Sequence, residues 1–364
     1  MFCVQRKVLV AMSGGVDSSV SAVLLRNMGY EIAGATMKLF DDGNNNCCNE
    51  KTCCSLNDVL DAKSVALKFD FEHYMFNFKD AFYKHVIKKF ASEYIEGRTP
   101  NPCLDCNKYL KFEKFLSRAM LLDYDLIATG HYARIEYDKK HDRRLLKKAK
   151  DKSKDQSYFL YGMTQYELSK TIFPLGDLLK SEVREIAEKN NLINAKKRES
   201  QDICFVRNKS YVDFLRDNFK IEFEPGNFID KDKNIIGKHK GIINYTIGQR
   251  KKLGMSFNRH MYVIKKNKFD NTIMLGDDKD LYRKNLIAGD INWILIKELK
   301  DKIKVNAKIR YNQEKEAEAF ISLYGNDENK VWVEFEKAQR AISPGQAIVF
   351  YDSDYVVGGG IILE

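Results

Sequence analysis

Residues 11–19 read AMSGGVDSS and lie between an apolar run at 7–12 and a glycine-free apolar stretch at 20–28. This order predicts a β-strand, a glycine turn and the first turn of a helix. Two adjacent glycines let the backbone approach an anion closely, and the unpaired N–H groups of the first helical turn point at it. The segment therefore predicts a phosphate site, and with it a chain that handles a nucleotide.

The loop is not a Walker A motif, because no Gly-Lys-Ser/Thr follows the glycines and no lysine is supplied to the terminal phosphates. Asp17 and Ser18 stand at the helix start instead. A carboxylate there suits a shared Mg²⁺ ion, which proteins usually hold by one or two carboxylates together with phosphate oxygens. The alternative is that Ser13, Asp17 and Ser18 only cap the helix.

Strand-like apolar runs alternate with helical patterns from residue 7 to about residue 133. This alternation predicts an α/β chain with a doubly wound parallel sheet, in which ligands bind at the carboxyl ends of the strands. The expected strands are 7–12, 31–40, 71–77 and 125–133, and the expected helices are 18–28, 56–69, 80–96 and 109–120.

Beyond about residue 220, short alternating segments separated by turn residues replace this pattern. They include an expected strand at 242–246. We predict a small β-containing central domain followed by a C-terminal β-barrel. The predicted domains are 1–207 for the nucleotide-binding part, with a basic hairpin and a helical part at 138–195, then 208–280 and 281–364.

Lys and Arg exceed Asp and Glu by 61 to 51, a surplus of 10, which permits a polyanionic partner without requiring one. The densest basic run, 139–154, is expected to form a hairpin, and such runs are commonly solvated faces. No apolar run approaches the roughly 20 residues of a membrane helix. A first strand so near the start leaves no room for a signal peptide, so no membrane partner and a cytoplasmic protein are expected.

Three of the eight cysteines lie in expected loops, where catalytic and binding residues are common. Cys103 and Cys106 form a C-x-x-C pair after a proline-rich stretch, and Cys204 lies in an expected extended segment at 200–206. An expected helix start beside Lys108 would favour the thiolate form of Cys106, which is the nucleophile. Cys204 has apolar neighbours, Ile203 and Phe205, and these alone favour the interpretation that it is a small buried side chain.

A second group of cysteines, Cys47, Cys48, Cys53 and Cys54, follows a polar tract. Four thiolates could bind zinc, but structural zinc ligands normally come from two separate pairs spaced by two to four residues. The simpler interpretation is that this segment opens the following helix and shapes the mouth of the site.

Seven short motifs resemble, in order, those of the bacterial tRNA-specific 2-thiouridylases, which belong to the ATP pyrophosphatase (PP-loop) superfamily. They are SGGVDSS at 13–19, the segment 98–106, GHYAR at 130–134, KDQSYF at 154–159, the segment 200–205, IGQRK at 247–251 and SPGQ at 343–346. The resemblance covers essentially the entire chain. It implies a transferase that adenylates the C2 oxygen of the wobble uridine of tRNA and then replaces this oxygen with sulfur, releasing AMP and pyrophosphate.

The resemblance also implies roles for single residues. Cys204 matches the persulfide carrier of the family and Cys106 the nucleophilic partner thiol, with an upstream sulfur-carrier protein as the source of the persulfide. ATP would be held by Ala11, Met12, Ser13, Gly14, Gly15, Val16, Asp17, Ser18, Met37 and Gly130, with Asp17 as a magnesium contact. The tRNA would be contacted by Asn101, Pro102, Cys103, His131, Lys154, Asp155, Gln156, Arg310, Tyr311 and Gln346.

One position departs from the family pattern, because Cys103 stands where some members carry an aspartate. An acid–base role therefore cannot be transferred to it. With Cys106 and Cys204 it could instead hold an iron-sulfur cluster with one open iron site, a rival to the persulfide relay. Two further alternatives are a PP-loop ligase acting on a small molecule, which has no use for two distant cysteines, and a non-catalytic RNA-binding protein, against which the intact 13–18 motif argues.

Overall fold

The computed structural model describes residues 5–40, 56–197, 203–206, 210–255, 257–325 and 327–364. The chain divides into two compact units. The first comprises Met1–Ile87, Pro102–Arg207 and Asp354–Val356, and the second comprises Lys88–Asn101, Asn208–Ser353 and Val357–Glu364. The boundaries near residues 207 and 280 stay a prediction, and the cysteine group at 47–54 lies outside the described residues.

The first unit is built on a parallel sheet with the strand order β3-β2-β1-β4-β7. Its strands are β1 (Lys7–Ala11), β2 (Glu31–Lys38), β3 (His73–Asn77), β4 (Leu126–Thr129) and β7 (Thr171–Ile172). Ala11 at the end of β1 pairs with Ala35 and with Thr129. The carboxyl ends of the three central strands therefore meet at one edge, as expected of a doubly wound sheet. The predicted α/β class is confirmed.

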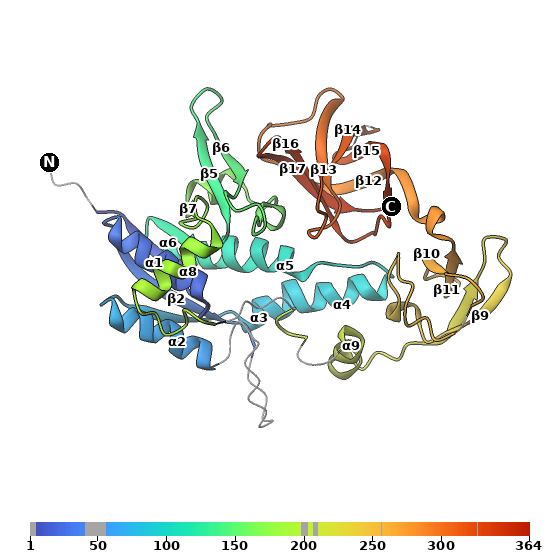
Figure 1. Ribbon diagram of the computed structural model, residues 1–364, viewed down its shortest axis with the longest axis horizontal. Coiled ribbons are helices and arrows are strands. Elements are labelled where there is room, and N and C mark those ends of the chain that lie inside the picture. The colour runs from blue at the N-terminus through green and yellow to red at the C-terminus, as the bar shows by residue number, and fades with distance from the viewer. Residues whose placement is uncertain (1–4, 41–55, 198–202, 207–209, 256, 326) are drawn as a thin grey trace. The chain divides into compact units, whose positions relative to one another are not determined.

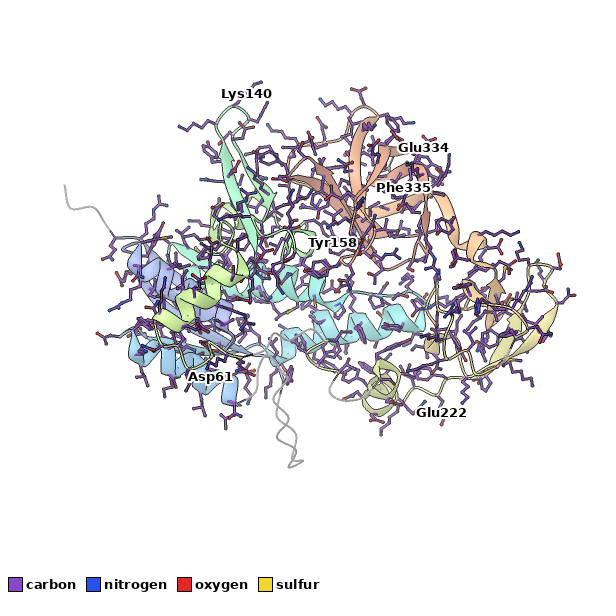
Figure 2. All side chains as sticks on the ribbon, in the orientation of Figure 1. Asp61, Lys140, Tyr158, Glu222, Glu334 and Phe335 are labelled. Carbon is purple, nitrogen blue, oxygen red and sulfur yellow. The ribbon has the colours of Figure 1, made fainter. Side chains whose placement is uncertain are left out.

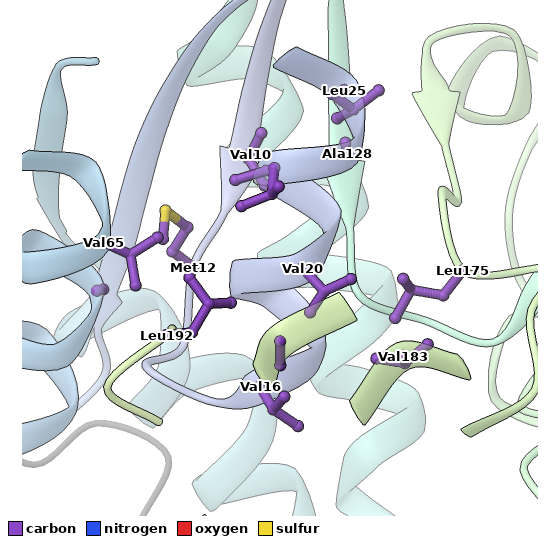
Figure 3. Packing of buried hydrophobic residues seen from close by; sticks show 14 of the residues in the cluster. Val10, Met12, Val16, Val20, Leu25, Val65, Ala128, Leu175, Val183 and Leu192 are labelled. Atoms are coloured by element: carbon purple, nitrogen blue, oxygen red, sulfur yellow. The ribbon is translucent and has the colours of Figure 1, made fainter. Parts of the chain in front are cut away.

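The helices of this unit are α1 (Val16–Asn27), α2 (Leu56–Lys68), α3 (Lys79–Phe82), the π-helix η1 (Tyr83–Ile87), α5 (Pro102–Asp105), the π-helix η2 (Cys106–Phe115), α6 (Leu116–Leu121), the 3-10 helix η3 (Ser157–Phe159), α7 (Gln165–Ser169) and α8 (Lys180–Lys189). Of these, α1, α2 and α6 pack directly against strands of the sheet and bury their apolar faces there. Figure 3 shows Val16 and Val20 of α1 with Val183 of α8 in one buried cluster.

A two-stranded hairpin follows β4 and carries the basic run. It consists of β5 (Ala133–Asp138) and β6 (Arg143–Lys148), paired from Ala133 with Lys148 to Asp138 with Arg143 (Figure 1). The single strand expected at 125–133 is therefore two strands, separated by residues 130–132. The predicted hairpin is confirmed.

The described residues of the second unit form α-helices, short 3-10 helices and two sheets. The α-helices are α4 (Lys88–Ile95) and α9 (Tyr211–Phe219). A small sheet has the order β10-β11-β8-β9 and is formed by β8 (Gly226–Ile229), β9 (Ile235–His239), β10 (Tyr262–Asn267) and β11 (Thr272–Gly276). Phe228, Val263 and Ile273 form its buried core. The strand expected at 242–246 is wrong, because Ile242–Asn244 form the 3-10 helix η4.

The C-terminal strands close into an antiparallel barrel, as predicted. They are β12 (Tyr282–Trp293), β13 (Ile303–Lys308), β14 (Ala317–Tyr324), β15 (Asp327–Arg340), β16 (Ala347–Asp352) and β17 (Tyr355–Ile362), preceded by the 3-10 helix η5 (Asp278–Leu281). The sheet order runs β12-β15-β14-β13-β16-β17, and the pairing of β12 with β17 closes it. In the part of the chain that the structure describes, no helix is long and apolar enough to cross a membrane.

Candidate active site

The glycine turn after β1 has the geometry that a phosphate loop requires. Gly14 has a φ of +71°, and a Cβ at this position would lie 2.2 Å from the carbonyl oxygen of Asp58. Only glycine fits there. Gly130, just after β4, also packs closely, because a Cβ on it would lie 2.9 Å from the backbone nitrogen of Ser18 in the first turn of α1. The loop and the end of β4 therefore form one tight junction.

Two side chains from distant sequence support the loop. Lys197 Nζ donates to the carbonyl oxygen of Gly14 at 3.2 Å and contacts the carboxylates of Asp58 and Asp61 at 2.7 and 2.6 Å. Burial opposes the charged form of Lys197, but the two carboxylates outweigh it and raise its pKa. The buried Asn194 donates from Nδ2 to the same Gly14 oxygen at 3.1 Å. The loop is thus held in place without a ligand.

The idea that the polar residues only cap α1 fails for Asp17. The N-cap residue is Gly15, and no side chain caps this helix end. Both carboxylate oxygens of Asp17 are bound by Lys180 Nζ, at 2.7 and 2.8 Å, and one also accepts a hydrogen bond from the Tyr132 hydroxyl at 2.9 Å. Lys180 and Tyr132 were missed by sequence reasoning, since nothing local relates them to the loop.

The end of β2 forms the second part of the predicted nucleotide site. Met37 is the penultimate residue of β2. Next to it, the hydroxyl of Thr36 donates to the carbonyl oxygen of Met12 at 2.8 Å and lies 3.0 Å from His73 Nε2. Burial, and secondarily Lys63, lower the pKa of His73. This chain of contacts fixes the backbone at the base of the phosphate loop.

The helix that carries Cys103 and Cys106 begins earlier than expected. It starts at Pro102, which suits the first turn of a helix because proline needs no N–H partner there. Cys106 is consequently the first residue of the π-helix η2 and lies one turn inside the helical segment, so the expected helix start at residues 107–108 is wrong. Cys103 is exposed and Cys106 is half-buried.

Cys204 lies on a short turn, which corrects the expected extended segment: Val206 N–H donates to the carbonyl oxygen of Ile203 at 3.0 Å. Its neighbour Phe205 is buried and packs edge-on against Phe82 of α3, with ring centroids 5.7 Å apart. Helix α3 also packs against η2, which Cys106 begins. The two half-buried cysteines are 98 positions apart in the sequence. The segments that carry them nevertheless pack against the same short helix, α3.

No group of three or more His, Cys, Asp or Glu side chains within the described ranges is arranged to hold a metal ion. These ranges include Cys103, Cys106 and Cys204. The three thiols are therefore not gathered as a ligand set in this conformation.

His131 is buried between the rings of Phe112 and Phe173. Its Nδ1 lies 2.7 Å from the hydroxyl of Thr129, and its Nε2 lies 3.3 Å from Lys111 Nζ. Burial, and then the charge of Lys111, hold the pKa of His131 well below its usual value. As Lys111 must donate, the neutral ring carries its proton on Nδ1.

Two residues of the predicted tRNA motif at 154–156, Asp155 and Gln156, make hydrogen bonds within the protein. The carboxylate of Asp155 accepts hydrogen bonds from Ala149 N–H at 3.0 Å and from the Ser157 hydroxyl at 2.8 Å. Gln156 Oε1 accepts one from Tyr132 N–H at 3.0 Å. Gln156 thus positions the tyrosine that contacts Asp17, while Lys154 is half-buried.

The remaining predicted tRNA contacts belong to the second unit, apart from Cys103 and Pro102; Pro102 is buried at the start of α5. Arg310 is exposed and Tyr311 half-buried in the connection between β13 and β14. Gln346 Nε2 donates to the carbonyl oxygen of Thr99, two residues before Asn101, at 2.6 Å.

Three family models match consecutive parts of the chain. They are the tRNA methyl transferase HUP domain at residues 6–208, the tRNA methyl transferase PRC-barrel domain at 212–277 and the aminomethyltransferase beta-barrel domain at 283–362. Two proteins named tRNA-specific 2-thiouridylase MnmA match nearly the full length. The one from Halothermothrix orenii is 49% identical over 98% of this chain and 99% of its own. The one from Caldicellulosiruptor saccharolyticus is 51% identical over 98% of each.

Two solved structures show a distant resemblance to the chain. A 4-thiouridine synthetase in complex with RNA and bound ATP has a TM-score of 0.37 at 14% identity, over 58% of this chain and 50% of the other. The U34-tRNA thiolase NcsA from Methanococcus maripaludis, with its 4Fe-4S cluster, has a TM-score of 0.34 at 18% identity, over 59% and 67%. Likenesses this low carry no inference about chemistry.

Proposed function

The chain belongs to the family of the tRNA-specific 2-thiouridylases, and we propose that it catalyses the ATP-dependent 2-thiolation of the wobble uridine of tRNA. The observation that supports this most directly is that one compact unit contains both the phosphate loop and the two helix-attached cysteines, Cys106 and Cys204. An activating site and a sulfur-transferring site are both needed for this reaction.

The first step is activation of a poor electrophile. The uridine C2 oxygen attacks the α-phosphorus of ATP, and pyrophosphate leaves. The loop from Ala11 to Ser18, with Met37 and Gly130, would bind the nucleotide, because its backbone N–H groups and the α1 dipole favour negative charge. Such donors also stabilise the charge that develops on the phosphate during transfer.

The second step replaces oxygen by sulfur. The terminal sulfur of a Cys204 persulfide attacks C2, and AMP departs with the former C2 oxygen. The Cys106 thiolate then attacks Sγ of Cys204, which closes a disulfide and leaves the terminal sulfur on C2 as the thiocarbonyl. An external thiol must reduce the disulfide, and an upstream sulfur-carrier protein must renew the persulfide.

A Mg²⁺ ion would neutralise phosphate charge at this site. A single carboxylate with phosphate oxygens is a normal donor set for Mg²⁺, and Asp17 supplies one in the first turn of α1. Asn101, Pro102 and Cys103 would face the target base. The hairpin β5–β6 and Arg310 with Tyr311 would contact the tRNA backbone, and a cytoplasmic location fits a tRNA substrate.

The test is incubation of the full-length protein with unmodified tRNA, ATP, Mg²⁺ and a persulfide donor, followed by mass spectrometry of the nucleosides. We expect 2-thiouridine from the wild type, and none from Cys106→Ser or Cys204→Ser, while both variants still release pyrophosphate in a tRNA-dependent manner. Formation of 2-thiouridine at the wild-type rate by Cys204→Ser would refute the relay.

Cys103→Ser separates the persulfide relay from the cluster, because the relay needs only the other two thiols. We expect this variant to form 2-thiouridine, with any loss confined to the KM for tRNA because Cys103 would face the target base. Loss of activity in Cys103→Ser, together with iron bound by the anaerobically purified wild type, would instead support the three-thiolate cluster.

A further inference from the structure

The structure brings a lysine to the phosphate loop from a remote part of the chain. Lys180 Nζ contacts Asp17 Oδ1 and Oδ2 at 2.7 and 2.8 Å and lies 5.6 Å from the centre of the Tyr132 ring. Lys180 and Asp17 are 163 positions apart. The lysine side chain is only 11% exposed, yet it ends at the first turn of α1, beside the loop whose own sequence contains no lysine.

Attachment of α8 to α1 does not require this ion pair. Val183 and Ala187 of α8 pack in the same buried cluster as Val16 and Val20 of α1, as the labelled valines in Figure 3 show. The start of α8 is fixed separately, because the backbone N–H of Lys180 donates to Asp151 Oδ2 at 3.0 Å. Since desolvation of two charges offsets much of their attraction, a buried ion pair is weak evidence for a stabilising role.

A second lysine near the loop makes a useful comparison. Lys197 is held by two carboxylates, those of Asp58 and Asp61, and its third contact is the backbone oxygen of Gly14. It supports the loop by binding a carbonyl. Lys180 instead binds the carboxylate of Asp17, which stands in the helix turn where a phosphate anion is expected.

We propose that Lys180 is the lysine of the nucleotide site: it neutralises Asp17 in the free protein and contacts the ATP phosphates in the complex. The inference rests on the proposed function for the presence of ATP. The Lys180 ammonium group beside Asp17 would offset the charge of both anions, in addition to the Mg²⁺ ion that Asp17 would help to hold. In a Walker A motif the lysine that contacts the phosphates is part of the loop itself, whereas here Lys180 comes from a helix that is remote in the sequence.

The test measures ATP binding by calorimetry with the full-length protein and Mg²⁺. Loss of a hydrogen bond to a charged group costs about 1.5–3 kcal/mol, which corresponds to roughly a 10- to 150-fold weaker affinity. We expect the Kd for ATP to rise at least tenfold in Lys180→Met and less in Lys180→Arg. Lys189→Met, an exposed lysine of the same helix, should leave it unchanged. A Kd for Lys180→Met within twofold of the wild type overturns the proposal.

A double variant separates direct contact from simple neutralisation of Asp17. If Lys180 acted only by neutralising Asp17, Lys180→Met would cost nothing in an Asp17→Asn background. We expect it to cost at least fivefold in ATP affinity there as well, and an equal affinity of Asp17→Asn and Asp17→Asn/Lys180→Met contradicts the contact. A wild type that binds no ATP overturns both this inference and the proposed function, whereas ATP binding that is indifferent to Lys180 overturns the inference alone.

Discussion

The side chain of Gln346 donates from Nε2 to the carbonyl oxygen of Thr99 at 2.6 Å, and the N–H of Thr99 donates to the carbonyl oxygen of Pro344 at 2.8 Å. Gly345 between them has a φ of +90°, and a Cβ there would lie 2.9 Å from Thr99 N. The barrel loop 343–346 therefore closes tightly on the segment 98–101. Along the chain, this segment immediately precedes the helix that carries Cys103 and Cys106.

Gln346→Ala should therefore slow catalysis. One neutral hydrogen bond contributes about 1 kcal/mol, or roughly fivefold in kcat if the held segment is needed in the transition state. Gln346→Glu should behave alike, because a carboxylate cannot donate to the Thr99 carbonyl oxygen. Steady-state thiolation kinetics check this. A raised KM for tRNA with unchanged kcat would show instead that Gln346 acts only as a tRNA contact.

Gly14→Ala is expected to disrupt the phosphate loop, while Gly15→Ala is not. The alanine Cβ at position 14 would lie 2.2 Å from Asp58 O and would force a left-handed residue, a strain of about 1–3 kcal/mol before the clash is counted. At position 15 the φ is −85°, and the nearest atom to a Cβ is Ser13 Oγ at 3.5 Å. Thermal unfolding should show a lower Tm for Gly14→Ala alone; equal Tm values would contradict this account of the loop.

The tip of the hairpin β5–β6 should contribute to tRNA affinity. Lys139 and Lys140 are exposed, and Figure 2 shows Lys140 at the tip. Lys147 is a poorer choice for substitution, because it contacts Glu136 at 2.8 Å and lies 5.0 Å from the Tyr355 ring centre. Each lost phosphate contact lowers the salt slope of log K by about 0.7–0.9.

Lys139→Ala/Lys140→Ala should therefore bind tRNA more weakly and show a slope about 1.5 smaller in a filter-binding titration with salt. The control is Lys63→Ala/Lys189→Ala, which removes two exposed lysines from helices of the same unit. If both doubles bind tRNA with the wild-type affinity and slope, the hairpin is only a solvated face.

Structural features that depend on consecutive residues could be predicted from the sequence. The run from 7 to 28 specified strand, turn and helix, because apolar periodicity and the glycine pair are local signals. The prolines before Cys103 were misleading. They indicated a loop, but Pro102 occupies the first turn of α5, and the helix start shifted accordingly.

Contacts between distant residues were beyond sequence reasoning. Lys180, Tyr132 and Lys197 meet the phosphate loop only because α8, the segment after it and the residues after β4 fold back onto the loop. No local sequence signal relates any of the three to the loop. The position of Cys204 likewise depends on tertiary packing, because its neighbour Phe205 packs against Phe82. No periodic pattern in the sequence indicates this contact.

Lys266 should give the stability of the second unit a distinctive dependence on pH. Burial lowers the pKa of this lysine in β10 from 10.5 to about 8, and its Nζ donates to the carbonyl oxygen of Tyr245 at 2.9 Å. Below pH 8 the folded and unfolded chains both carry the proton, so the burial penalty is fully present. Between pH 8 and about 10.5 the folded chain has released the proton while the unfolded chain still binds it, so stability rises with pH.

Lys266→Met removes this linkage, and the comparison of variants isolates it because other titrating groups cancel. As the pH rises from 8 to 10, we expect the free energy of unfolding of the wild type to increase relative to that of Lys266→Met by about 2 kcal/mol. Lys265→Met, which alters the exposed neighbour, should run parallel to the wild type. Denaturant unfolding at pH 7, 8, 9 and 10 provides the measurement. The two free energies of unfolding can diverge with pH only if Lys266 loses its proton on folding. A difference between the wild type and Lys266→Met that stays constant from pH 7 to pH 10 would therefore mean that Lys266 remains solvated and protonated in the folded protein.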